Sequence, residues 1–125
     1  AALSLCRENA EANGVNARTI KTDMFDGIAD KYDIIVCNPP YLTANDMASL
    51  QRELTFEPAN ALYGGEDGLD FYRRIARDYA QRLNDGGALA LEVGIYQAEE
   101  VAKMLGGARI VKDVCGIERA VIKEW

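Results

Sequence analysis

The chain has 125 residues, 49% hydrophobic and 27% charged, which suits one globular domain with one hydrophobic core. No apolar run approaches the ~20 residues needed to cross a bilayer, so we expect no membrane contact and a cytoplasmic location. Fourteen basic residues against twenty acidic ones give a net charge of −6, which disfavours binding by phosphate neutralisation, and we expect no direct nucleic-acid contact.

The first predicted elements are a helix and a strand. Apolar residues at helical spacing predict a helix from the first residues to a stop at Asn13-Gly14. No N-cap residue precedes this helix, so we expect an upstream part of the protein to be missing from this sequence. Residues 17–22 are predicted to form a short strand, which ends in turn-forming residues at 23–27.

A buried strand is predicted over residues 32–37, and Asn-Pro-Pro-Tyr follows it directly at residues 38–41. The carboxyl end of a strand in an open α/β sheet is where ligands bind. Residues 43–52 are predicted to form a short helix or irregular lid with Thr43 as its N-cap. Residues 53–67 are predicted to be a long loop without secondary structure, a kind of loop that is often functional.

The second half of the chain alternates helices with strands. The predicted helices cover residues 69–83 and 97–105, and the predicted strands cover residues 88–93, 109–114 and 120–123. The helix over 69–83 is predicted to stop at residues 84–87, and the last two strands to form an antiparallel hairpin. This alternation predicts one α/β domain over residues 1–125, with a parallel sheet covered by helices on both faces and an antiparallel edge.

Few side-chain types are available for catalysis. The chain has no histidine, which excludes His-dependent triads and His-ligated metals. Cys6, Cys37 and Cys115 are widely spaced without a Cys-x-x-Cys pair, so we expect neither disulfides nor a zinc site, and no metal. Any chemistry must use carboxylates, amides, backbone groups or a bound cofactor.

The Asn-Pro-Pro-Tyr segment, which we call the tetrapeptide, is an acceptor-rich turn. Pro39 and Pro40 lack a backbone N–H, and Asn38 adds a side-chain carbonyl. These acceptors suit a planar –NH2 group, on which Tyr41 can stack. Methyl transfer to such a nitrogen needs positioning rather than histidine or metal. The alternative is structural, because Asn-Pro begins many turns and two prolines end a strand.

Asp23 and Met24 follow the strand predicted over residues 17–22. Without a cofactor, Asp23 is interpreted as a turn or N-cap residue. With one, Asp23 can accept a hydrogen bond from an adenine amino group, and Met24 can contact the purine face.

These residues resemble class I S-adenosylmethionine-dependent methyltransferases that carry the Asn-Pro-Pro-Tyr motif. More narrowly, the chain resembles the bacterial enzymes that methylate the glutamine amide of the Gly-Gly-Gln motif in peptide-chain release factors. The tetrapeptide alone is shared with methyltransferases that act on base amino groups, and the segments after it point to glutamine. The segments that carry the resemblance include Asp23-Met24-Phe25, Asn38-Pro39-Pro40-Tyr41, Phe56-Glu57-Pro58, Gly64-Gly65, Gly68-Leu69, Glu92-Val93-Gly94, Gln97, Lys112-Asp113 and Glu118-Arg119.

The resemblance implies a Rossmann-like sheet, S-adenosyl-L-methionine as cofactor and release factors as partners. Asn38 and the Pro39 carbonyl would orient the glutamine amide, and Tyr41 would pack on it. Met24 stands where the family often has an aromatic residue. By resemblance, the catalytic residues are Asn38, Pro39 and Tyr41, the substrate-binding residues are Asn38, Pro39, Pro40 and Tyr41, and the cofactor-binding residues are Asp23, Met24 and Asn38.

The family's first two strands, glycine-rich cofactor loop and amino-terminal helical domain have no counterpart in this sequence. The resemblance therefore implies the carboxyl-terminal part of a catalytic domain. The two strands would lie between those at residues 17–22 and 32–37, so we expect the chain to re-pair its strands or to associate with a second copy through exposed edges. Two other functions stay open: methylation of an exocyclic amine of a nucleic-acid base, and a non-catalytic fragment that binds no cofactor.

Overall fold

The computed structural model describes residues 2–50 and 52–125 of the chain. Its sheet has four strands in the order β1-β2-β4-β3, with β1 parallel to β2 and β4 antiparallel to both neighbours. The strands are β1 (Tyr32–Cys37), β2 (Leu83–Glu92), β3 (Arg109–Lys112) and β4 (Glu118–Glu124). The predicted α/β sheet with an antiparallel carboxyl-terminal hairpin is confirmed.

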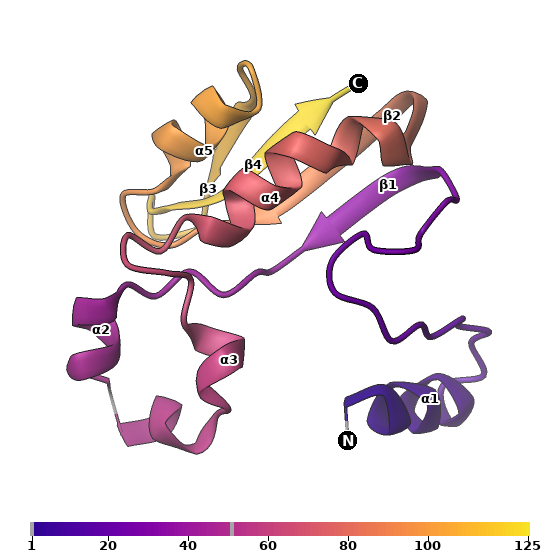
Figure 1. Cartoon of the computed structure of the whole chain (residues 1–125), viewed down its shortest axis with the longest axis horizontal. Helices are drawn as coiled ribbons and strands as arrows, with labels where there is room; N and C mark the ends of the chain where they lie inside the picture. The colour runs from indigo at the N-terminus through magenta and orange to yellow at the C-terminus, as the bar shows by residue number, and fades with distance from the viewer. Residues whose placement is uncertain (1, 51) are drawn as a thin grey trace.

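Two helices cover one face of this sheet (Figure 1). They are α4 (Asp70–Asp78), which continues as the 3-10 helix η2 (Tyr79–Arg82), and α5 (Ala98–Met104). The core forms where their apolar stripes meet the sheet. Tyr72 and Ile75 of α4 and Val101 of α5 belong to one cluster with Leu89 and Leu91 of β2, and all are at most 1% exposed. The helices predicted from periodicity alone are confirmed.

The other face of the sheet carries exposed apolar side chains, so the prediction of helices on both faces is wrong for the described residues (Figure 1). Ile34 pairs with Ala88, and Val36 pairs with Ala90. Ile34 is 67% exposed and Val36 is 76% exposed. Within the described ranges, no helix is long and apolar enough to cross a membrane.

The strand predicted over residues 17–22 is wrong, because this segment is irregular. It follows α1 (Ala2–Ala12), and β1 lies at the edge of the sheet. A strand exists only when its backbone groups pair with a neighbour, and this segment has no pairing with β1 in the described part of the chain. Side chains hold it instead: Arg7 Nε donates to Thr19 Oγ1 at 2.7 Å.

The connection between β1 and α4 contains more structure than predicted. It holds α2 (Ala44–Ala48), the 3-10 helix η1 (Arg52–Phe56) and α3 (Ala59–Leu62), so the prediction of an unstructured loop over residues 53–67 is wrong. These helices have no buried residues among those described, which explains why no apolar stripe marks them. The predicted N-cap is confirmed, since Thr43 Oγ1 accepts from Asp46 N at 3.1 Å. Residue 51 of the predicted 43–52 helix lies outside the described residues.

Strand β2 begins earlier than predicted. Residues 84–87 were expected to end a helix, but β2 starts at Leu83, which pairs with Tyr32. The end of the chain stabilises this extension, because Gly86 N donates to the Trp125 carbonyl at 3.1 Å. A turn-forming sequence therefore becomes strand through partners that are distant along the chain.

Candidate functional site

The tetrapeptide lies where the two parallel strands of the sheet end. Cys37 is the last residue of β1 and pairs with Leu91 of β2. Asn38 and Glu92 therefore follow at the same edge of the sheet, toward α2 and α3 in Figure 1. This is the edge at which open α/β sheets bind ligands.

All four residues of the tetrapeptide line one cavity of about 210 Å³, which we call the tetrapeptide cavity. Asn38 is exposed, Pro39 is buried, and Pro40 and Tyr41 are half-buried. The remaining lining residues are Leu42, Leu54, Glu57, Ala61 and Leu62. The structure thus brings together every residue predicted to bind or act on the substrate.

Tyr41 also borders a second, larger cavity. This cavity of about 770 Å³ shares Tyr41, Leu42 and Leu54 with the tetrapeptide cavity, so these residues form the wall between the two. Its polar lining includes Asp67 and Arg119. A ligand longer than one side chain therefore has room on both sides of Tyr41.

Charged side chains of both signs act on Tyr41. Partial burial raises the pKa of the Tyr41 hydroxyl above its ordinary value, the carboxylates of Glu92 and Glu57 raise it further, and the guanidinium of Arg119 opposes them. The phenol is therefore neutral at neutral pH. Glu92 was not singled out as a site residue, because only the packing of β2 beside β1 brings it to Tyr41. Glu57 belongs to the Phe-Glu-Pro segment, which by itself predicts no contact with Tyr41.

The backbone after the tetrapeptide is held by the last residue of α3 and the segment that follows this helix. Leu42 N donates to the Leu62 carbonyl, and Gly64 N donates to the Leu42 carbonyl, both at 2.9 Å. A Cβ atom at Gly64 would lie 2.7 Å from the Pro40 carbonyl oxygen. Only glycine allows this close approach, which explains part of the Gly-Gly sequence at residues 64–65.

Neither Asp23 nor Met24 lines the tetrapeptide cavity. Asp23 Oδ1 forms an ion pair with Arg74 Nη2 of α4 at 3.0 Å. The Asp23 side chain is still 67% exposed. Met24 adopts a left-handed backbone conformation with φ of 54° and packs against the edge of the core. Of the three residues predicted to bind the cofactor, only Asn38 lines the tetrapeptide cavity.

Sequence comparisons relate the chain to methyltransferases. The family model described as the methyltransferase small domain matches residues 1–67. A Geobacter sulfurreducens protein named release factor glutamine methyltransferase is 40% identical over 127 residues, which cover 96% of this chain and 45% of that protein. A Xanthomonas campestris protein named ribosomal protein uL3 glutamine methyltransferase is 43% identical over 95 residues, which cover 74% of this chain and 31% of that protein. The chain spans less than half the length of both relatives.

A solved structure shares the fold. The crystal structure of a methyltransferase from Pyrococcus furiosus superposes with a TM-score of 0.67 at 19% sequence identity. The match covers 98% of this chain and 56% of that one. The predicted fold, a partial Rossmann-like methyltransferase sheet, is confirmed.

Proposed function

This chain belongs to the methyltransferase small domain family, and from that membership we propose that it forms the substrate-binding part of an S-adenosylmethionine-dependent methyltransferase. The proposed substrate is the glutamine side-chain amide of the Gly-Gly-Gln motif in peptide-chain release factors, which implies a cytoplasmic location. The observation that carries the proposal is the single cavity lined by the whole tetrapeptide. The names of both relatives support glutamine rather than a base amine.

In this proposal the chain's own residues orient the amide. The Asn38 side-chain carbonyl and the Pro39 backbone carbonyl accept the two hydrogens of the –NH2 group, which turns the nitrogen toward the methyl donor. Tyr41 lies against the flat amide and excludes water. Asp23, Met24 and Asn38 contact the cofactor, whose positively charged sulfur makes its methyl group electrophilic.

The test uses a chimera in which this chain replaces the matching segment of the Geobacter sulfurreducens relative. We expect the chimera to methylate a Gly-Gly-Gln peptide, and Asn38→Ala to lower kcat/KM by about 100-fold or more, because displaced reacting groups lose rate on that scale. Asn16→Ala, at an exposed position after α1, is the control and should leave the rate unchanged. Appreciable residual turnover of the Asn38→Ala chimera, with wild-type stability, would contradict the role of Asn38.

Two further substrates distinguish the alternatives. The match to the uL3 glutamine methyltransferase makes a glutamine peptide from that ribosomal protein the second candidate, and single-stranded DNA containing adenine tests a base amine. We expect the Gly-Gly-Gln peptide to be methylated fastest, since the release factor relative matches 96% of this chain and the uL3 relative 74%. Faster methylation of either other substrate would reassign the function.

A further inference from the structure

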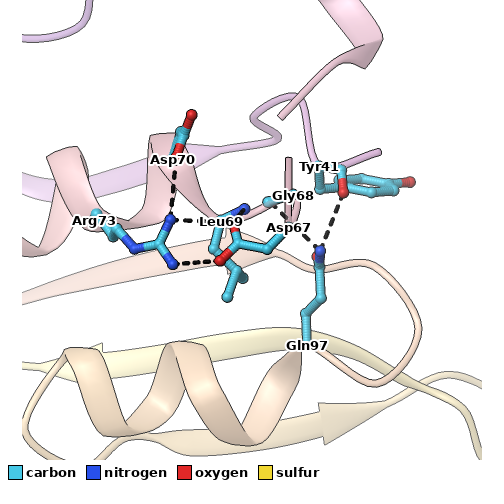
Figure 2. Close-up of polar contacts among 7 residues, drawn as sticks. All are labelled: Tyr41, Asp67, Gly68, Leu69, Asp70, Arg73 and Gln97. Atoms are coloured by element: carbon cyan, nitrogen blue, oxygen red, sulfur yellow. Dashed lines mark hydrogen bonds and ion pairs between the residues drawn. The ribbon is translucent and has the colours of Figure 1, made fainter. Parts of the chain in front are cut away.

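Gln97 connects three segments at the edge of the sheet that carries the tetrapeptide. It precedes α5, and its side chain is half-buried. Its Oε1 accepts from Gly94 N at 3.0 Å. Its Nε2 donates to the carbonyls of Tyr41 at 3.1 Å and Gly68 at 3.4 Å, as Figure 2 shows. These partners fix the orientation of the amide, because a backbone N–H only donates and a carbonyl only accepts.

The surrounding backbone is packed closely around this amide. A Cβ atom at Gly94 would lie 2.8 Å from Gln97 Oε1 and 2.9 Å from Tyr41 Cδ2. A Cβ atom at Gly68 would lie 2.6 Å from Gln97 Nε2 and would collide with the Tyr41 carbonyl oxygen. Glycine at both positions leaves the space that the Gln97 side chain and Tyr41 fill.

The tetrapeptide needs such an anchor because of its composition. Pro39 and Pro40 have no N–H, so neither can donate a backbone hydrogen bond. Its position therefore depends on β1 before it, on the pairing of Leu42 with Leu62 after it, and on bonds to its carbonyls. The Gln97 bond to the Tyr41 carbonyl is of this last kind.

We propose that Gln97 is a positioning residue for methyl transfer: it fixes the backbone at Tyr41 and thereby the acceptors that hold the substrate amide. Gln97 lines the larger cavity beside Tyr41 but not the tetrapeptide cavity. Because its amide is already bonded to the backbone of Gly94, Tyr41 and Gly68, it acts through the tetrapeptide rather than on the substrate amide. This inference rests on the proposed function. Because misplaced reacting groups lose rate steeply, loss of the Gln97 anchor should lower kcat while substrate and cofactor affinities change little.

The sharpest variant is Gln97→Glu, because it keeps an acceptor for Gly94 N and replaces the NH2 donor with an oxygen that faces two carbonyls. In the chimera we expect kcat for the Gly-Gly-Gln peptide to fall roughly 10- to 100-fold, with KM changing less than about threefold. Gln97→Met removes the hydrogen bonds without adding charge and should lower kcat similarly. Gln81→Glu makes the same charge change at an exposed position of η2 and should have no effect.

The pH dependence separates positioning from a structural defect. As pH falls toward about 4.3, the ordinary pKa of a glutamate, the carboxyl introduced by Gln97→Glu becomes protonated and can donate again. The ratio of its kcat to that of the unsubstituted chimera should therefore rise as pH falls, whereas the ratio for Gln97→Met should stay constant. Unchanged kcat in both variants would overturn the proposal.

A second readout uses this chain itself and does not need methyl transfer. With ¹³C-labelled tyrosine, we expect Gln97→Glu and Gln97→Met to shift the Tyr41 ring resonances. Gln97→Met should also lower the pKa of the Tyr41 hydroxyl toward its ordinary value, because a released segment is less buried and this variant adds no charge. Gln81→Glu should leave both unchanged. If the unsubstituted chimera methylates no glutamine, the proposed function is wrong. If neither Gln97 substitution changes the Tyr41 signals, the anchoring role of Gln97 is wrong, whatever the outcome for the chimera.

Discussion

Tyr72 joins the hydrophobic core to the edge of the sheet that carries the site. Its side chain is 1% exposed, and its hydroxyl donates to the backbone carbonyl of Glu92 at 2.8 Å. Burial raises the pKa of the Tyr72 hydroxyl well above its ordinary value. The hydrogen bond that joins α4 to the last residue of β2 therefore requires the protonated hydroxyl of Tyr72.

We expect Tyr72→Phe to lower the free energy of unfolding by about 1 kcal/mol at pH 7, because the Glu92 carbonyl loses a buried donor. The pKa of the Tyr72 hydroxyl is higher in the folded state than in the unfolded state, so the protonated hydroxyl stabilises the fold. This contribution to the free energy of unfolding is complete below the ordinary pKa of about 10, and it is lost as pH rises from there through the folded-state pKa.

Urea unfolding at pH 7 and pH 10.5 measures both effects. The unsubstituted chain should lose stability between these pH values, and Tyr72→Phe should lose less. Tyr96→Phe is the control, because Tyr96 is 95% exposed. An equal pH dependence in Tyr72→Phe and in the unsubstituted chain would show that Tyr72 does not carry this linkage.

The tetrapeptide shows how far residue-level chemistry can predict a site. Its acceptor character follows from two prolines and one asparagine, and the structure places all four residues around one cavity. Glu92 and Gln97 could not be assigned from the sequence in the same way, because their roles depend on contacts between strand ends. Gln97 and Tyr41 are 56 positions apart.

At the level of elements, the site is a junction of loops rather than the product of one helix or strand. Gly68 has a φ of +76°, and the space beside it is occupied by the Tyr41 carbonyl and the Gln97 amide. Gly86 has a similar φ of +78°, but no atom lies within 4 Å of the position a Cβ would take. The two glycines share the sign and size of φ and differ in crowding.

This pair separates conformational strain from steric collision. Gly86→Ala should cost about 1–2 kcal/mol, from left-handed strain alone. Gly68→Ala should cost about 1–3 kcal/mol more, because its Cβ collides with neighbouring atoms, and should also perturb the Tyr41 resonances. Chemical denaturation of both variants checks the difference. Equal destabilisation would mean that the loops before α4 and after β1 are not packed as described.

At the level of the whole molecule, the chain buries less surface than its mass allows. Its accessible surface is 8501 Å², whereas a compact monomer of 13.7 kDa exposes about 6,600 Å². Part of the excess is the open face of the sheet, where Ile34 and Val36 of the edge strand β1 are exposed. An apolar face beside an unpaired edge favours association.

We therefore expect the isolated chain to self-associate, and Val36→Lys to weaken this association at least about tenfold by placing a charge at the apolar edge. Val114→Lys is the matched control, because Val114 is fully exposed in the turn between β3 and β4, away from β1. Sedimentation equilibrium over a range of concentrations measures the effect. A monomer at every concentration would contradict the prediction.

We expect cofactor affinity to depend on more residues than the few that this chain is proposed to contribute. Only Asp23, Met24 and Asn38 are proposed to contact the cofactor from this chain, and Asp23 also pairs with Arg74. We expect calorimetric titration with S-adenosylhomocysteine to show weak or no binding to the isolated chain and clear binding to the chimera. Equally tight binding to both would show that this chain contains a complete cofactor site.

The sequence by itself determined the helices over residues 69–83 and 97–105, the strand over residues 32–37 and the tetrapeptide. Their signals are local: apolar periodicity, β-branched residues, and prolines that remove donors. Only the tertiary structure decided that residues 17–22 form no strand, that residues 84–87 do, and that Gln97 reaches Tyr41. A strand requires a partner, and a hydrogen bond between distant segments requires the fold that brings them together, so neither can be determined from local sequence.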